Sequence, residues 1–205
     1  WKLPTKSAIS QARIRLGSAP VEAMFRQVTQ PIATVDTPGS FLAGRRLVAV
    51  DGTTFDLADS PDNDLFFGRP GVAKGERAAF PQARVVAMAE CGTHVMFDAE
   101  IGTYSAGERE LAGPLIDRLE PDMLMLADRG FYSFPLWEQA AATGADLLWR
   151  ISKQVKPHPI EELSDGSWLV EIRPPNTPGL KDREAFRVRL IDYTVNNGTG
   201  QESGE

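Results

Sequence analysis

Two short apolar runs, each ending in an aspartate, constrain the fold of this sequence more than any other feature. One run, residues 47–50, is followed by Asp51 and Gly52, and the other, residues 124–127, is followed by Asp128, Arg129 and Gly130. Apolar runs this short, closed by glycine, are typical of buried strands rather than of core helices. Because sheets bind ligands at the carboxyl ends of their strands, the two aspartates form a candidate pair.

The segments around these runs predict an α/β fold with a mixed sheet and flanking helices. The first strand is followed by a hairpin of two strands at residues 83–89 and 94–101 and by a helix at 105–119. The Asp128 strand at 124–128, a second helix at 134–143 and a last strand at 146–151 come next. A helical crossover makes the strands that it relates parallel. We therefore expect the Asp128 strand beside the Asp51 strand, with their acids side by side.

The ends of the chain predict two further regions. Helices at residues 6–16 and 21–28, followed by a linker rich in Pro, Gly and Thr, form a small helical amino-terminal region over residues 1–44. Residues 45–152 hold the core. Residues 153–205 form a small β-rich region, with strands at 168–172 and 186–193 and a polar tail. The tail and the lack of an initial Met lead us to expect an amino-terminal fragment of a longer protein.

The two amino-terminal helices leave two interpretations open. Joined by Gly17, they resemble a helix-turn-helix in which Arg13, Arg15 and Arg26 contact phosphates. They equally fit a helical appendage that packs on the main domain.

Composition limits the classes of function. The net charge of −6 argues against nucleic-acid binding through bulk positive potential, so any such binding depends on local chemistry. No apolar stretch is long enough to predict a membrane span, and we expect no membrane partner. The single cysteine, Cys91, excludes an internal disulfide framework and fits a reducing cytoplasm.

A long irregular segment, residues 65–80, mixes Phe66 and Phe67 with Arg69, Lys74 and Arg77. Aromatic and basic residues interleaved in this way suit contact with nucleic acid, although the two phenylalanines also fit a place in the core. The acidic stretch before it, residues 59–64, lacks the central Gly and terminal Glu of a calcium loop, and we interpret it as a solvated turn.

Paired carboxylates at strand ends can perform acid–base chemistry, bind a divalent metal or be capped structurally. Oxygen-only ligands favour Mg²⁺ or Mn²⁺ over zinc, and two such ions suit phosphoryl transfer. Nothing else in the sequence indicates a sugar cleft. Phosphatases of the haloacid-dehalogenase type need a nucleophilic aspartate two residues before the Asp51 position, where this chain has Ala49.

The segments from Val48 to Thr53 and from Leu126 to Ser133, with residues 9–17 before them, resemble the DDE transposases of bacterial insertion sequences of the IS-four type. The resemblance covers nearly the whole chain. It implies a ribonuclease-H-like core, Mg²⁺ or Mn²⁺, and cleavage and strand transfer of element DNA by a homodimer in a synaptic complex, in the bacterial cytoplasm at the nucleoid. By this resemblance Asp51 and Asp128 are the first two catalytic, metal-binding acids.

The sequence departs from the family in one respect. The family's third acid, a Glu, lies on a helix after a β-rich insertion, and no such helix follows the insertion here. Glu161, Glu162 and Glu171 belong to the insertion and are poor substitutes. The alternative function is therefore a catalytically inactive remnant that binds only DNA or a transposase.

We expect positive charge to gather on the face that bears the two aspartates. Arg129 also has an alternative role as an ion-pair partner of Asp128. The predicted DNA-binding residues are Arg69, Lys74, Arg77, Arg129, Arg150 and Lys153.

Overall fold

The structure is a computed structural model that describes residues 3–71, 77–196 and 201–204. The first half of the chain contains α1 (Lys6–Leu16), α2 (Ala19–Val28), β1 (Phe41–Leu42), β2 (Arg45–Asp56), α3 (Pro61–Phe67), β3 (Gln82–Glu90) and β4 (Met96–Thr103). The second half contains α4 (Glu108–Ile116), β5 (Met123–Ala127), α5 (Phe134–Ala142), β6 (Asp146–Trp149), β7 (His158–Glu162), β8 (Trp168–Ile172), β9 (Phe186–Leu190), β10 (Tyr193–Asn196) and β11 (Gln201–Gly204).

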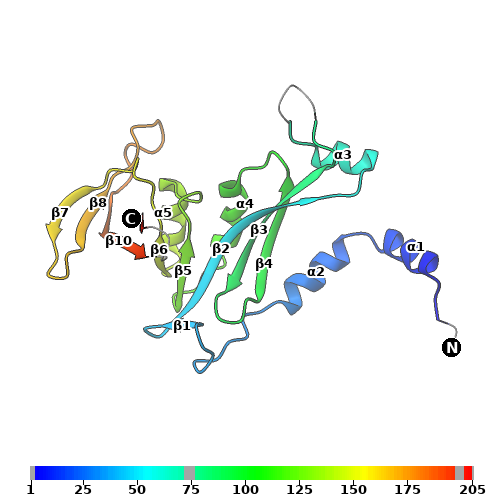
Figure 1. Ribbon diagram of the computed structural model, residues 1–205, viewed down its shortest axis with the longest axis horizontal. Helices are drawn as coiled ribbons and strands as arrows, with labels where there is room; N and C mark the ends of the chain where they lie inside the picture. Colours follow the sequence, from blue (N-terminus) through cyan, green and yellow to red (C-terminus); the bar gives the residue numbers. More distant parts are fainter. Residues whose placement is uncertain (1–2, 72–76, 197–200, 205) are drawn as a thin grey trace.

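The main sheet has the order β4-β3-β2-β5-β6, with the short β1 paired to β2 (Figure 1). β2, β3 and β4 form an antiparallel meander, whereas β5 runs parallel to β2 and β6 runs parallel to β5. This arrangement confirms the predicted ribonuclease-H-like mixed sheet. It also confirms that the strand before Asp128 lies beside the strand of Asp51.

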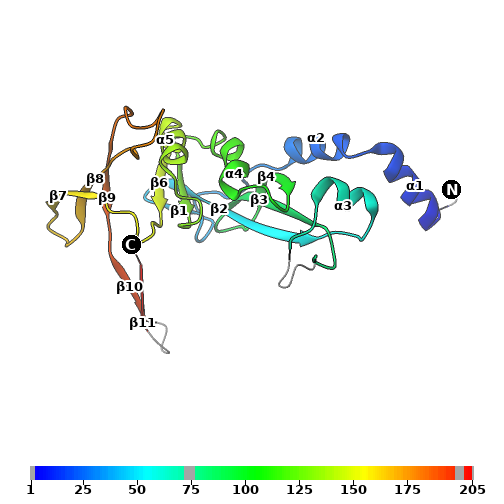
Figure 2. The same ribbon diagram turned by 90° about the horizontal axis from the view of Figure 1, so that it is seen from above.

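The main hydrophobic core lies between one face of this sheet and the two helices α4 and α5, which Figure 2 shows on the same side of the sheet. Side chains alternate between the faces of a strand. Val48 and Val50 of β2, with Met125 and Ala127 of β5, are buried on the helix side. Asp51 therefore points to the opposite face of the sheet.

A small three-stranded sheet of β7, β8 and β9 follows the core, and β10 and β11 form a hairpin. Phe186 and Val188 of β9 pack against the main core, and the ring centroid of Phe186 lies 5.3 Å from that of Phe134 in α5. The sequence predicted β8 but missed β7. The predicted strand at 186–193 is divided into β9 and β10, with Ile191 and Asp192 between them.

Both amino-terminal helices form as predicted, although α2 begins two residues earlier. Arg26 of α2 makes ion pairs with Asp98 at 3.2 Å and Glu100 at 2.8 Å, both on β4. Its guanidinium is thus held by carboxylates of the core, which corrects the helix-turn-helix interpretation that made Arg26 a phosphate contact. Among the described helices, none combines the length and apolarity that crossing a membrane would require.

The linker before β2 is fixed by a buried ion pair between Arg46 and Glu90. The carboxylate of Glu90 also accepts hydrogen bonds from the Ala33 amide at 2.9 Å and the Thr93 hydroxyl at 2.6 Å. Although burial alone raises the pKa of Glu90, these donors and Arg46 lower it below its ordinary value of 4.5. The linker is thereby tied to the end of β3.

The acidic stretch at 59–64 is not a solvated turn, as the sequence analysis expected, but leads into α3. The Ser60 side chain accepts a hydrogen bond from the Asn63 amide at 3.3 Å, and Pro61 occupies the first helical position. A serine cap followed by proline is a standard helix start, so the signal was present in the sequence. The helix takes Phe66 and Phe67 out of the irregular segment predicted at 65–80.

Candidate active site

Asp51 and Asp128 directly follow the last paired residues of the parallel strands β2 and β5. Val50 and Ala127 are register partners of β2 and β5, and each is followed directly by one of the aspartates. Both aspartates are exposed to solvent. Asp128 follows the end of β5, whereas Asp51 lies within β2, which continues to Asp56 in its pairing with β3.

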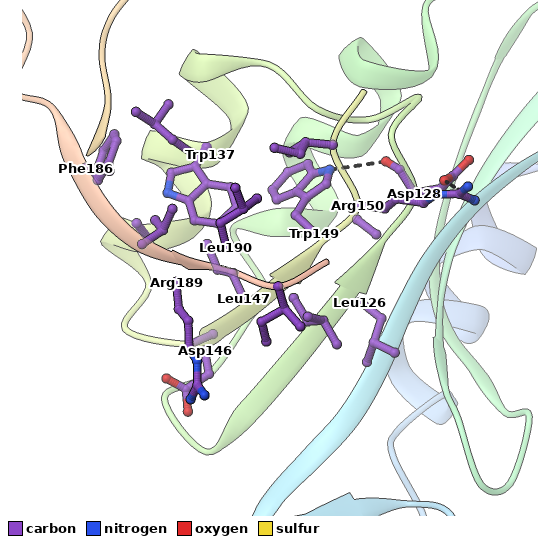
Figure 3. Close-up of a pocket in the computed structure, with 18 of the residues that line it drawn as sticks. Leu126, Asp128, Trp137, Asp146, Leu147, Trp149, Arg150, Phe186, Arg189 and Leu190 are labelled. Atoms are coloured by element: carbon purple, nitrogen blue, oxygen red, sulfur yellow. Dashed lines mark hydrogen bonds and ion pairs between the residues drawn. The ribbon is translucent and has the colours of Figure 1, made fainter. Parts of the chain in front are cut away.

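Nearby groups orient the two carboxylates differently. Asp51 Oδ1 accepts a hydrogen bond from the Gly52 amide at 2.8 Å. Asp128 Oδ1 lies 3.8 Å from a guanidinium nitrogen of Arg150, and the Asp128 carbonyl oxygen accepts a hydrogen bond from Trp149 Nε1 at 3.2 Å (Figure 3). The ion-pair partner of Asp128 is therefore Arg150, which corrects the interpretation that gave this role to Arg129.

The donor set of the pair fits a hard divalent cation. Carboxylate oxygens are the ligands that Mg²⁺ and Mn²⁺ prefer, and the exposed position leaves room for the waters that Mg²⁺ retains. In the parts of the chain that the structure describes, no group of three or more His, Cys, Asp or Glu side chains is arranged to hold a metal ion. The candidate site thus offers two acids, which can hold a cation only with water completing its coordination.

A groove of about 1290 Å³ is lined by Asp51 and Asp128 and by residues of β6, α5 and β9. Figure 3 shows it from Asp128 to Phe186. One wall is aromatic, with Trp137 and Trp149 at 5.6 Å between ring centroids and Phe186 beyond them. Arg187 and Arg189 of β9 also line the groove, and Arg189 is paired with Asp165. The lining is therefore mostly apolar, with charged residues of both signs among it.

Three of the predicted DNA-binding residues lie on the segments that leave the strand ends of the site. Arg129 follows Asp128 directly and is exposed, Arg150 pairs with Asp128, and Lys153 is exposed three residues further along. Among these three residues, Arg150 is the one for which the described part of the chain shows a contact with Asp128.

The other predicted DNA-binding residues lie elsewhere, beyond the carboxyl end of β2. The side chain of Arg69 is only 14% exposed and forms ion pairs with Asp59 and Asp64, so its guanidinium is already engaged. Arg77 is 62% exposed and pairs with Asp64 at 2.8 Å. Lys74 lies outside the described residues. The expected single basic cluster is therefore divided between two places.

Two residues that support the site were not singled out from the sequence. Trp149 holds the Asp128 carbonyl, as described above, and Arg109 of α4 donates from Nε to the Gly130 carbonyl oxygen at 2.8 Å. Both contacts join residues about twenty positions apart. Because local spacing carries no signal for such contacts, only the folded arrangement reveals them.

Comparison with known proteins assigns the chain to a family. The family described as Transposase DDE domain matches residues 42–196, which is more than half of the chain. Transposase InsG for insertion sequence element IS4, from Escherichia coli strain K12, is 34% identical over 169 residues, covering 82% of this chain and 38% of that protein. Putative transposase InsZ, from the same strain, is 31% identical over 147 residues, covering 72% of this chain and 49% of that protein. The chain thus spans less than half the length of either curated relative.

Among solved structures, a chain in the cryo-EM structure of the piggyBac transposase synaptic complex with hairpin DNA is 13% identical. The similarity covers 95% of this chain and 42% of that chain, with a TM-score of 0.43, which is too low to define a shared fold by itself. The assignment therefore rests on the family match. By the match over residues 42–196, this chain belongs to the DDE transposase family.

Proposed function

We propose that the chain provides the first two metal-binding acids of a DNA transposase, which cleaves DNA and transfers the strands of an insertion sequence. The observation that carries the proposal is that Asp51 and Asp128 directly follow the last register partners of the parallel strands β2 and β5, in a chain of the DDE family. In this proposal residues 45–152 are the first part of the catalytic core. Residues 1–44 and 153–205 are the amino-terminal region and the β-rich insertion.

The two aspartates would hold Mg²⁺ or Mn²⁺ through their exposed oxygens. When bound, such ions activate the attacking oxygen and stabilise the leaving oxygen in phosphoryl transfer. Arg150 lies within 3.8 Å of Asp128 and would turn toward a DNA phosphate once a cation occupies the carboxylates. Arg129 and Lys153 would contact further phosphates, and we call Arg129, Arg150 and Lys153 the cationic border of the site.

The proposed partners are the DNA ends of the element, a target DNA and a second copy of the protein in a synaptic complex. The family assignment and the names of the curated relatives support DNA as the substrate. Arg187, an exposed residue that lines the groove, would add a further phosphate contact. We retain Arg77, and Lys74 from the sequence alone, as a second contact region; Arg69 would need to give up its ion pairs first.

A catalytically inactive module that binds only DNA or a transposase remains the alternative function. It is favoured by one observation: the described residues gather two acids at the site and no third ligand. Phosphoryl transfer depends on accurate placement of nucleophile, metal and leaving group, and an error of about 1 Å can reduce the rate ~100-fold. We therefore expect residues 1–205 alone to cleave DNA very weakly.

The experiment that tests the proposal measures Mg²⁺-dependent nicking of a plasmid that carries the DNA flanking the gene. Residues 1–205 are compared with a longer form of the same reading frame, each with and without Asp51→Asn and Asp128→Asn. The proposal expects cleavage by the longer form that either substitution abolishes. DNA binding by the longer form without cleavage under any metal would favour the inactive module instead.

A further inference from the structure

The first turn of α4 contacts both backbone segments that carry the aspartates. Arg109 donates a hydrogen bond to the Gly130 carbonyl oxygen at 2.8 Å. Glu108 packs against the segment that follows Asp51: a Cβ placed on Gly52 would be 2.9 Å from Glu108 Oε1 and 3.2 Å from its Cγ. A Cβ on Gly130 would be 3.9 Å from Glu108 Oε2. The Glu108 carboxylate therefore lies between the glycines that follow the two acids.

The position of Glu108 is not explained by the ordinary role of an acid at a helix start. An acid in the first turn interacts favourably with the helix dipole, but Glu110, in the same turn, provides that interaction from an exposed position. Glu108 is half-buried, and its carboxylate makes no hydrogen bond or ion pair with any residue that the structure describes. The Glu108 carboxylate instead lies against the backbone of Gly52.

Glu108 acts where the sheet no longer connects the two segments. The ladder between β2 and β5 ends at Val50 and Ala127, so no strand pairing joins Gly52 to Gly130. The turn after β5 is held from one side by Trp149 and from the other by Arg109. The Glu108 side chain fills the gap that remains, in a space that is open only because residue 52 has no Cβ.

We propose that Glu108 is a positioning residue, which packs across Gly52 and Gly130 and so sets the separation of Asp51 and Asp128. This inference rests on the proposed function, because the separation matters only if the two acids share a cation. A metal site tolerates little displacement of its ligands. Removal of groups that hydrogen-bond metal ligands typically changes metal affinity about 10–100-fold, and we expect the loss of packing at Glu108 to act at the lower end of that range. Glu108 would act through the shape of its side chain rather than through its charge.

The test measures the affinity of the chain for Mn²⁺ by electron paramagnetic resonance titration, without any need for catalysis. Glu108→Ala removes the packing and should weaken Mn²⁺ binding at least about tenfold. Glu108→Gln keeps the length and shape of the side chain and should restore affinity to within about twofold of the wild type, on the same reasoning. Glu110→Ala is the matched control, since it removes an acid from the same helical turn, and it should leave affinity unchanged.

A second measurement tests the packing itself by thermal unfolding. Gly52→Ala places a Cβ against Glu108 and should lower the melting temperature in the wild-type background. The same substitution should be tolerated better in the Glu108→Ala background, where the space is free. Equal effects of Gly52→Ala in both backgrounds would contradict the contact.

The outcomes separate this inference from the proposed function. If Glu108→Gln is as weak as Glu108→Ala, the carboxylate acts on the cation by its charge, and the positioning role is overturned. If Glu108→Ala binds Mn²⁺ like the wild type, the inference fails while the proposed function stands. If the wild type binds no Mn²⁺ through Asp51 and Asp128, both are overturned.

Discussion

Val50 and Ala127 are the last register partners of the parallel strands β2 and β5, and an exposed aspartate follows each of them. The register is fixed by the core, because a slip of one residue would turn the buried face of either strand outward. The same register brings the two acids together. The placement of the site is thus a consequence of the packing of apolar residues on α4 and α5.

The cationic border of the site should contribute to DNA affinity through individual phosphate contacts. Replacing Arg150 and Lys153 by Ala should weaken binding to duplex DNA and reduce the slope of log affinity against log salt by about 2. Fluorescence anisotropy over a range of salt concentrations measures both quantities. Arg45→Ala is the control, because Arg45 pairs with Asp146 at the amino-terminal ends of β2 and β6, away from the aspartates. Unchanged salt dependence in the double variant would contradict a DNA role for these residues.

The buried pair of Arg46 and Glu90 should make stability depend on pH in the acid range. Burial raises the pKa of Glu90, but hydrogen bonds from Thr93 and Ala33 and the pairing with Arg46 outweigh it, so its pKa lies below 4.5 in the folded chain. A lowered pKa in the folded state gives stability that is present above the unfolded value and lost as the pH falls through the folded value.

Glu90→Gln should therefore lower the free energy of unfolding by about 3 kcal/mol at neutral pH, since it leaves Arg46 without its charge partner. The difference from the wild type should shrink as the pH falls below 4.5. Denaturant titrations at several pH values measure this. Glu120→Gln, at an exposed position, provides the control. A difference that does not change with pH would contradict the account of the ion pair.

Trp149 links the core to the candidate site. Its indole nitrogen donates to the Asp128 carbonyl at 3.2 Å while its ring packs near Trp137 and Tyr132. Trp149→Phe removes the donor and part of the packing, so we expect a loss of about 1–3 kcal/mol in stability together with weaker Mn²⁺ binding. Trp168→Phe, on the small sheet, should affect Mn²⁺ binding little. Equal effects of the two substitutions on Mn²⁺ affinity would contradict this link.

The central fold was predictable because its signals are local. Two apolar runs ending in Asp51 and Asp128 predicted the strands, and the intervening hairpin and helix predicted their parallel pairing. The strand pattern depends on burial, which leaves a clear period in the sequence. The capping sequence Ser60-Pro61 was equally local, and α3 was missed because the acidic residues after it suggested a turn.

The fine structure of the site was not predictable, since it depends on contacts between distant residues. Arg26 was interpreted as a phosphate contact, but the fold brings it to carboxylates on β4. Glu108 carries no motif, and its relevance appears only when α4 is seen against Gly52. Charged residues on helices have similar spacing whether they face solvent, an ion-pair partner or a site, so the sequence leaves their partners undetermined.

The central claim is that Asp51 and Asp128 together form a divalent-cation site, and a Mn²⁺ titration followed by electron paramagnetic resonance tests it most directly. The account predicts one Mn²⁺ site in the wild-type chain whose affinity falls at least about tenfold in both Asp51→Asn and Asp128→Asn. Asp146→Asn, at the amino-terminal end of β6, should bind Mn²⁺ like the wild type. Wild-type Mn²⁺ affinity in either Asp51→Asn or Asp128→Asn, or a chain that binds no Mn²⁺ at all, would contradict it.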